Sequence, residues 1–242
     1  MKDLFSSHSS AYAAFRPHYP QDLYDFIFNH IKSFDNAWDT GTGNGQAAFE
    51  LAKRFQKVYA TDISAGQIEN AVGASNIQYS IGCETVTLPD HFVDLITVAQ
   101  AIHWFNREKF YAEVKRVAKP GAVVAVWGYG LLSVNTEIDL IIRDFYKSII
   151  GPYWDPERRL IDDAYKTIEF PFSEVASPPF DFSFHWSLAQ LEGYITTWSS
   201  VQKYIQQNGK NPVPDMVEKL RAYWCPSRIK VTFPLFLRLG TI

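Results

Sequence analysis

The stretch that decides the fold, residues 34–51, reads Phe-Asp-Asn-Ala-Trp-Asp-Thr-Gly-Thr-Gly-Asn-Gly-Gln-Ala-Ala-Phe-Glu-Leu. A short apolar run ends at Asp39, glycines alternate at positions 41, 43 and 45, and good helix formers follow from Gln46 to Phe55. This pattern predicts a strand, a tight glycine turn and a helix. Glycine loses more conformational entropy on folding than any other residue. Three glycines in one turn therefore indicate that the backbone there must take a conformation, or approach another group so closely, that a side chain would prevent it.

A ligand bound close to the backbone would explain the three glycines. At the carboxyl end of a strand, the first amides of the next helix point outward with partial positive charge, and glycines let a ligand approach them closely. We therefore predict a nucleotide-like cofactor at the turn. The alternative is a glycine-rich turn that binds nothing.

Two details favour S-adenosylmethionine over a dinucleotide. The dinucleotide fingerprint G-x-G-x-x-G/A needs a small residue at its sixth place, which here, counted from Gly41, holds Gln46. Asp39 would repel a pyrophosphate, whereas its carboxylate suits the ammonium group of S-adenosylmethionine.

The position of the next acid also indicates an adenosine site. Residues 57–62 are rich in strand formers and end at Asp62, about 20 residues after the first glycine. A carboxylate there can accept hydrogen bonds from both ribose hydroxyls. The alternative is that Asp62 belongs only to the start of the next helix, where Ser64 and Gln67 can form a capping box.

Strands and helices continue to alternate up to Gly130. We expect strands at residues 77–81, 92–99 and 122–127, with a helix at 106–118 before the last of them. The alternation then stops. The later part predicts helices at 136–150, 188–207 and 216–223, a lid inserted at 152–179, and strands at 180–186 and 229–239, the last with an edge or a bulge at Pro234.

With these motifs the chain resembles class I S-adenosylmethionine-dependent methyltransferases over most of its length. The resemblance rests on residues 39–45, Asp62, Cys83-Glu84, residues 100–105 and residues 119–121. Residues 12–20, 153–159 and 197–204 further resemble a subgroup similar to trans-aconitate methyltransferases. The family implies an α/β fold with a Rossmann-like, seven-stranded, mostly parallel sheet, flanking helices, an antiparallel last strand and, in this chain, an inserted lid.

The same resemblance implies one methyltransferase domain over residues 1–242. We expect an N-terminal arm at 1–19, a cofactor-binding core at 20–130, a helix and substrate lid at 131–179, and closing strands and helices at 180–242. Residues 180–239 would supply the final two strands of the sheet.

The resemblance assigns site residues by matching positions of this sequence to the motifs of the family. In the family, the glycine turn and the acid before it hold the methionine part of the cofactor, the acid after the second strand holds the ribose, and Cys83-Glu84 would frame the adenine. The predicted cofactor-binding residues are Asp39, Gly41, Thr42, Gly43, Gly45, Asp62, Ile63, Cys83, Glu84, Ala99, Gln100 and Arg16. The predicted substrate-binding residues are Tyr12, Tyr19, Trp104, Trp154, Arg158 and Arg159.

The predicted reaction is methyl transfer to a small molecule. Transfer from a sulfonium needs positioning, exclusion of water and at most one general base. His103, which follows the central strand, is the candidate base, and a hydrogen-bonded wall residue is the alternative. Arginine forks bind carboxylates, so Arg16, Arg158 and Arg159 indicate a carboxylic acid substrate, unless the last two pair with acids on a solvated loop. An NAD(P)-dependent oxidoreductase and a non-catalytic S-adenosylmethionine-binding protein remain rival hypotheses.

Composition narrows the partners and the compartment. A net charge of −3 and a pI near 6.1 offer no basic surface for nucleic acid. Cys83 and Cys225 lack the spacing of a disulfide framework or a metal site. We expect a soluble cytoplasmic protein without metal or membrane segment, and the oligomeric state stays open.

Overall fold

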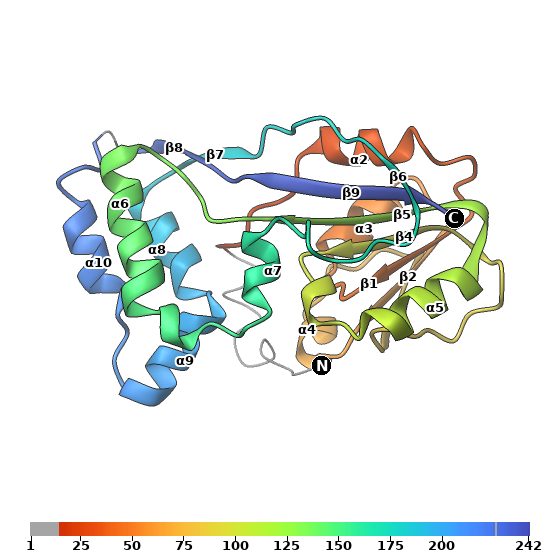
Figure 1. Cartoon of the computed structure of the whole chain (residues 1–242), viewed down its shortest axis with the longest axis horizontal. Helices are drawn as coiled ribbons and strands as arrows, with labels where there is room; N and C mark the ends of the chain where they lie inside the picture. Colours follow the sequence, from red (N-terminus) through yellow and green to blue (C-terminus); the bar gives the residue numbers. More distant parts are fainter. Residues whose placement is uncertain (1–14, 226) are drawn as a thin grey trace.

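The fold is built on a seven-stranded sheet with the strand order β3-β2-β1-β4-β5-β9-β6 (Figure 1). The computed structural model describes residues 15–225 and 227–242. The strands are β1 (Asn36–Thr40), β2 (Lys57–Asp62), β3 (Ile77–Ile81), β4 (Val93–Ala99), β5 (Ala118–Tyr129), β6 (Ser173–Val175) and β9 (Leu235–Thr241). Strands β1 to β5 run parallel, and β9 runs antiparallel to β5 and β6. The predicted fold class is confirmed.

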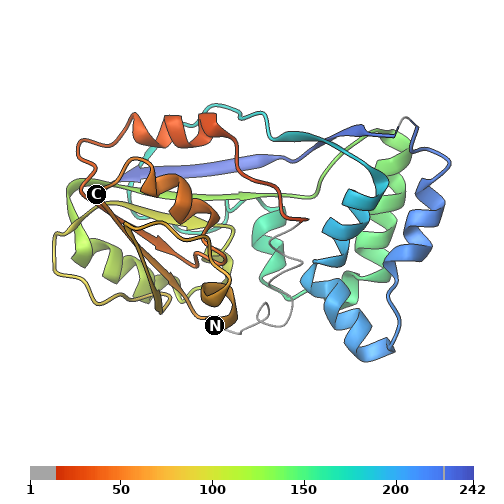
Figure 2. The same cartoon turned by 180° about the vertical axis from the view of Figure 1, so that it is seen from behind.

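Helices cover both faces of the sheet (Figures 1 and 2). α2 (Gln21–Phe28) and α3 (Gln46–Ala52) pack on the face that carries Ala37 and Leu95, whereas α5 (Arg107–Val117) packs on the face that carries Trp38 and Ile96. Neighbouring residues of a strand point to opposite faces, so a strand buried on both faces must be apolar throughout. The nearly continuous apolar run of β4 is therefore explained by its central place. The short helix α4 (Ala65–Glu69) follows β2.

A second group of helices lies at one end of the molecule, beyond the carboxyl end of β5 (Figures 1 and 2). It contains α6 (Thr136–Asp144), α8 (Leu188–Thr196), α9 (Ser199–Asn208) and α10 (Val213–Leu220). These helices share a core with the two-stranded sheet of β7 (Ser183–Trp186) and β8 (Ile229–Thr232). Between this group and the main sheet stands α7 (Arg158–Asp162), reached through the short helices η3 (Phe145–Ile149) and η4 (Gly151–Tyr153).

The sequence prediction placed two strands wrongly. Residues 180–186 were expected in the main sheet, but β7 pairs with β8 instead. The main sheet instead contains β6, an edge strand that pairs with β9 and lies inside the predicted lid at 152–179. β6 has three residues, too few for an alternating pattern to be read.

Two predicted elements are interrupted. The strand expected at 229–239 is split into β8 and β9 around Phe233-Pro234, because proline has no amide to donate to a ladder. The helix expected at 188–207 is split into α8 and α9, and its predicted capping box of Ser187 and Gln190 is confirmed.

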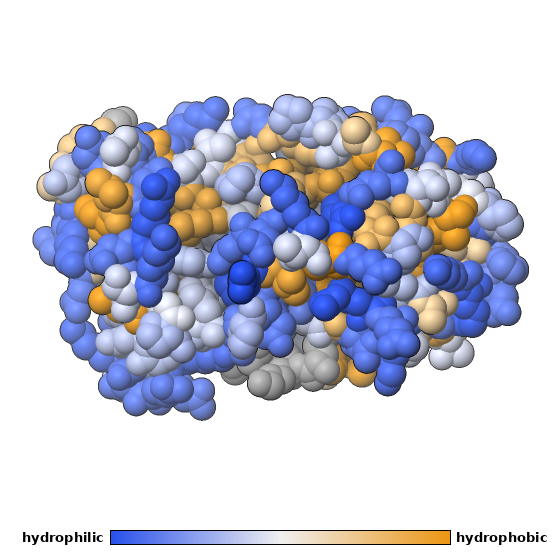
Figure 3. Space-filling view, in the orientation of Figure 1, coloured by the Kyte–Doolittle hydropathy of each residue, from blue (hydrophilic) through white to orange (hydrophobic). Residues whose placement is uncertain are grey.

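The surface seen in the view of Figure 1 is largely hydrophilic (Figure 3). An apolar patch lies over α6, the helix that carries Leu140, which is 61% exposed. In the part of the chain that the structure describes, no helix is both long and apolar enough to cross a membrane.

Asp94 in β4 links β4 to the starts of β1 and β5 at the amino end of the sheet. Its buried carboxylate accepts hydrogen bonds from the backbone amides of Asp35 and Asn36 at 3.2 and 3.0 Å. It also accepts one from the ammonium of Lys119, at the start of β5, at 2.8 Å. The lysine pairs with the Asp35 carboxylate at the same distance.

We expect Asp94→Ala to lower the free energy of unfolding by about 1–3 kcal/mol, because two amides and an ammonium lose a buried acceptor. Urea denaturation followed by fluorescence measures this change. The control is Glu218→Ala, which removes an exposed ion pair with Arg221 and should cost less than about 0.5 kcal/mol. Equal losses in the two variants would contradict the structural role of Asp94.

Candidate functional site

The turn between β1 and α3 contains three glycines with left-handed backbones. The φ angles of Gly41, Gly43 and Gly45 are 64°, 56° and 82°. A Cβ atom at Gly41 would lie 2.5 Å from the Cβ of Ala101, and one at Gly45 would overlap the hydroxyl of Tyr79. At Gly43, no atom of the described residues would lie within 4 Å of such a Cβ. Packing therefore requires Gly41 and Gly45, whereas Gly43 borders open space.

This open space belongs to a cavity of about 420 Å³, partly open to solvent, which we call the turn cavity. Its size suits a small-molecule site. Of the predicted cofactor-binding residues, it is lined by Arg16, Gly41, Thr42, Gly43, Ala99 and Gln100. Asn44 and Gln46, inside the glycine motif, and Tyr129, at the end of β5, also line it.

Asp39 supports the turn from inside the protein. Its fully buried carboxylate accepts the hydroxyl of Thr42 at 2.5 Å and that of Thr97, in β4, at 2.6 Å. Burial raises the pKa of this carboxyl to about 6, although both hydroxyls oppose the rise. Asp39 does not line the turn cavity, so it influences the cavity through Thr42.

Asp62 lies at the end of β2, beside the turn. One of its carboxylate oxygens accepts the amide of Gly43 at 2.8 Å, and the other accepts the amide of Ser64 at 2.9 Å. Each carboxylate oxygen can accept two hydrogen bonds. The carboxylate thus holds the backbone of Gly43 in its left-handed conformation.

The residues predicted near the adenine lie outside the lining of the turn cavity, as does Ile63. The carbonyl oxygen of Cys83 accepts the hydroxyl of Thr40 at 2.5 Å, and burial raises the pKa of the Cys83 thiol. The carboxylate of Glu84 accepts the amide of Asn106 at 2.9 Å. These contacts attach the end of β3 to β1 and to the start of α5.

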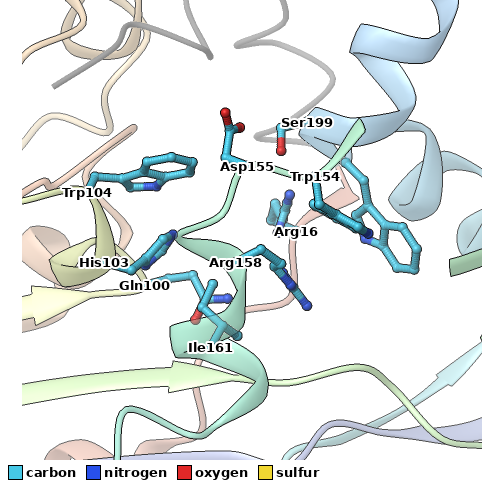
Figure 4. A pocket seen from close by; sticks show the side chains of 10 residues that line it. Arg16, Gln100, His103, Trp104, Trp154, Asp155, Arg158, Ile161 and Ser199 are labelled. Carbon is cyan, nitrogen blue, oxygen red and sulfur yellow. The ribbon is translucent and has the colours of Figure 1, made fainter. Parts of the chain in front are cut away.

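A second cavity, of about 500 Å³ including space open to solvent, lies between η2 (Ile102–Trp104) and the lid (Figure 4). We call it the lid cavity. Arg16 and Gln100 line both cavities. The structure brings four further predicted residues to this wall, namely His103 and Trp104 from η2 and Trp154 and Arg158 from the lid.

Two of the predicted substrate residues that the structure describes, Arg159 and Tyr19, do not line the lid cavity. The Arg159 side chain is 87% exposed and lies 3.9 Å from Asp163 of its own segment, so the prediction that it lines the site was wrong. It follows Arg158 on a short helix, and the two side chains point to different sides. Tyr19 lines the turn cavity instead and packs on Trp127 with ring centroids 5.5 Å apart. Tyr12 lies outside the described residues.

Arg158 is held firmly while its outer nitrogens stay available. Its Nε donates to the Tyr146 hydroxyl at 2.8 Å and lies 3.5 Å from Asp162. The guanidinium stacks over Trp154, 4.7 Å from the ring centroid, and the side chain is 18% exposed. Nη1 and Nη2 make no hydrogen bond with residues 15–225 or 227–242. An arginine fixed in this way presents two donors to the cavity.

Gln100 stands where the two cavities meet. Its φ of 55° is unusual for a residue with a side chain and indicates local strain. The side chain binds both backbone groups of Tyr129, with Oε1 accepting at 2.8 Å and Nε2 donating at 3.1 Å. A Cβ on Gly128 would lie 2.5 Å from this Oε1, so a glycine is needed there. The Tyr129 hydroxyl in turn accepts Nη1 of Arg16 at 3.0 Å.

His103 is 4% exposed, and its Nδ1 lies 2.9 Å from the hydroxyl of Tyr165. Burial, assisted by the charge of Arg158, lowers the pKa of His103 to about 3. The imidazole is therefore neutral at physiological pH. Neutrality leaves a nitrogen that can accept a proton, but the low pKa makes His103 a weak base.

The sequence analysis missed several wall residues. Asp155 lines the lid cavity and pairs with Lys203 at 2.6 Å, and Trp198 and Ser199 line it from the junction of α8 and α9. These positions lie in residues 153–159 and 197–204, which carry the resemblance to a methyltransferase subgroup, but nothing in the sequence assigned them to the wall, because packing between distant segments brings them together. Asn44 and Gln46 could have been predicted, since they stand in the glycine motif itself.

Comparison with known proteins identifies the family. A methyltransferase-domain family model matches residues 38–126. The "Putative methyltransferase" of Dictyostelium discoideum is 37% identical over 248 residues, which cover 98% of this chain and 94% of that protein. The solved structure of a "Putative Type II Methyltransferase" from Anaeromyxobacter dehalogenans has a TM-score of 0.85 at 36% identity and covers 94% of this chain and 98% of its own.

More distant structures share the fold. One is a phosphoethanolamine N-methyltransferase of Haemonchus contortus in complex with S-adenosylhomocysteine, with a TM-score of 0.51 at 15% identity over 98% of this chain and 58% of that one. The predicted enzyme class and cofactor are confirmed, and the oxidoreductase hypothesis is excluded. The chain belongs to the class I S-adenosylmethionine-dependent methyltransferases.

Proposed function

We propose that this methyltransferase methylates a small organic anion, a carboxylic acid, bound in the lid cavity. The observation that carries the proposal is Arg158, whose stacked and mostly buried guanidinium directs its outer nitrogens to no acceptor among the described residues. Two parallel N–H groups match the two oxygens of a carboxylate. The resemblance of residues 153–159 to enzymes similar to trans-aconitate methyltransferases supports the same class of substrate.

The charges around the lid cavity favour an anion. Arg16 and Arg158 both line it, and the carboxylate of Asp155 is already paired with Lys203 at 2.6 Å. Among the described lining residues, two arginines therefore stand against one acid, and that acid already has a cationic partner. The rings of Trp104, Trp154 and Trp198 supply apolar surface for the body of the substrate.

The residues of the turn cavity fit the cofactor. The left-handed backbone of Gly43 leaves room where a side chain would stand, and the Asp62 carboxylate is positioned beside it. The backbone of the turn would hold the methionine part and Asp62 the ribose, while Asp39 would act through Thr42. When bound, S-adenosylmethionine supplies a methyl group on a positively charged sulfur. The two ligands would meet at the shared wall of Gln100 and Arg16.

The arm and the lid would exclude water from this meeting point. Arg16, Pro17 and Tyr19 of the predicted arm line the turn cavity, and Trp154 and Arg158 of the predicted lid line the other. Exclusion of water strengthens the attraction between opposite charges and protects the transfer from hydrolysis.

We expect Gly43→Ala to weaken binding of S-adenosylhomocysteine by about 10-fold or more, because the added methyl enters the cavity and strains a backbone with a φ of 56°. Titration calorimetry measures the affinity. The matched control is Gly209→Ala, which has a φ of 67° and equally open surroundings but lies at the end of α9. Wild-type affinity in Gly43→Ala would show that the cofactor does not contact the turn.

We expect Arg158→Lys to raise the KM for the acid substrate about 10- to 100-fold, because lysine keeps the charge but loses the fork that binds a carboxylate. The affinity for S-adenosylhomocysteine should stay unchanged. Initial rates over a panel of small carboxylic acids, phenols and amines provide the measurement. Arg159→Lys is the control and should match the wild type, since that side chain is 87% exposed. A neutral phenol or amine that turns over faster than every acid would refute the proposal.

A further inference from the structure

His103 and Tyr165 form a buried pair at the wall of the lid cavity. Tyr165 is fully buried and follows α7, whereas His103 belongs to η2 after the central strand. Nδ1 of the ring and the tyrosine hydroxyl are 2.9 Å apart, and the two rings have centroids 6.0 Å apart. His103 lines the cavity (Figure 4). Tyr165 is not among the lining residues.

The backbone holds Tyr165 in an unfavourable conformation. Tyr165 and its neighbour Ala164 have φ angles of 57° and 51°, which is rare for residues with a side chain and rarer for a bulky one. Such strain persists only where the surrounding structure imposes it, and it is commonly found at functional sites. The position of the Tyr165 hydroxyl is thus set by the fold.

The direction of the hydrogen bond can be deduced from the available partners. A neutral imidazole has one nitrogen that donates and one that accepts. Within the described residues, the Tyr165 hydroxyl has a single hydrogen-bond partner, Nδ1 of His103. If Nδ1 carried the proton, the hydroxyl would have to leave its own hydrogen unpaired in the protein interior, which is costly. Tyr165 therefore donates to Nδ1, and the proton of the ring sits on Nε2.

We infer that Tyr165 holds His103 as its Nε2–H tautomer, so that His103 donates a hydrogen bond to the anionic substrate instead of removing a proton from it. Nε2 makes no hydrogen bond with residues 15–225 or 227–242, and its ring lines the cavity that Arg158 also lines. Tyr165 is then a positioning residue. The anionic nature of the substrate is taken from the proposed function.

The chemistry of a carboxylate agrees with this role. As the new bond between carboxylate oxygen and methyl carbon forms, the bond between that carbon and sulfur breaks and its electron pair stays on sulfur. No proton is released, so the reaction needs no base. A donor at Nε2 would hold the carboxylate together with the guanidinium of Arg158, and burial with the charge of this arginine keeps the imidazole neutral.

Nitrogen-15 NMR of the histidine rings tests the tautomer in the wild-type protein without any substrate. Two-bond correlations distinguish an Nε2–H ring from an Nδ1–H ring, and His103→Gln identifies the signal among the six histidines. We expect the Nε2–H pattern, which should change toward a mixture in Tyr165→Phe. Tyr111→Phe is the matched control, because that hydroxyl donates to the carbonyl of Glu169 at 2.6 Å. An Nδ1–H pattern in the wild type would overturn the inference, whatever the screen of acids shows.

Activity with the acid found in the screen tests the role of the donor. Glutamine keeps an N–H group near the place of Nε2 but cannot act as a base, so His103→Gln should keep kcat/KM within about 10-fold of the wild type, while His103→Ala should lose about 10- to 100-fold more. Unchanged affinity for S-adenosylhomocysteine confirms that both variants are folded. If both variants lose activity equally, His103 acts as the base and the inference fails. If no acid is turned over, the proposed function fails while the tautomer is still decided by NMR.

Discussion

The turn cavity depends on two carboxylates that hold one glycine turn. Asp39 binds Thr42 and Thr97 from below the turn, and Asp62 binds the amide of Gly43 from the side. Each of these hydrogen bonds takes the place of a bond to water that the buried group has lost. Together they keep the backbone in a left-handed conformation that only glycine adopts easily. The turn is in this way prepared before a ligand arrives, which lowers the entropy lost on binding.

The two cavities arise from different levels of structure. The turn cavity follows from local sequence and the parallel sheet, since β1, β2 and β4 end at the same edge. The lid cavity needs Trp154, Arg158 and Trp198, which packing between the lid and the second group of helices brings to the end of β4. Gln100 connects the two cavities, because it lines both together with Arg16. Its side chain is hydrogen-bonded to Tyr129, which in turn accepts a hydrogen bond from Arg16. Strain at Gln100 thus lies where cofactor and substrate would meet.

The sequence was most informative where spacing alone determines geometry. The glycine turn, Asp62 at the end of β2 and the central position of β4 could be predicted, because each depends on residues that are close along the chain. β6 and the split between β8 and β9 could not, since a three-residue edge strand gives no periodic signal and a proline allows several outcomes. The pairing of Asp155 with Lys203 joins residues 48 positions apart, and the different fates of Arg158 and Arg159 depend on how α7 is packed.

The same physical features that make His103 a poor base favour the anionic substrate that we propose for the lid cavity. Burial removes the water that would stabilise an imidazolium, and the nearby Arg158 adds a repulsive positive charge, so the pKa of His103 falls to about 3. The effect of Arg158 on a carboxylate is the opposite, because the positive charge attracts the carboxylate and the loss of water strengthens that attraction. A cavity arranged for proton removal would instead place an acid beside the histidine, as a partner for the imidazolium. Among the described residues of this wall, the acid is Asp155, which is paired with Lys203, while His103 is hydrogen-bonded to a neutral hydroxyl. Such an arrangement favours binding a substrate that is already charged over generating the charge within the site.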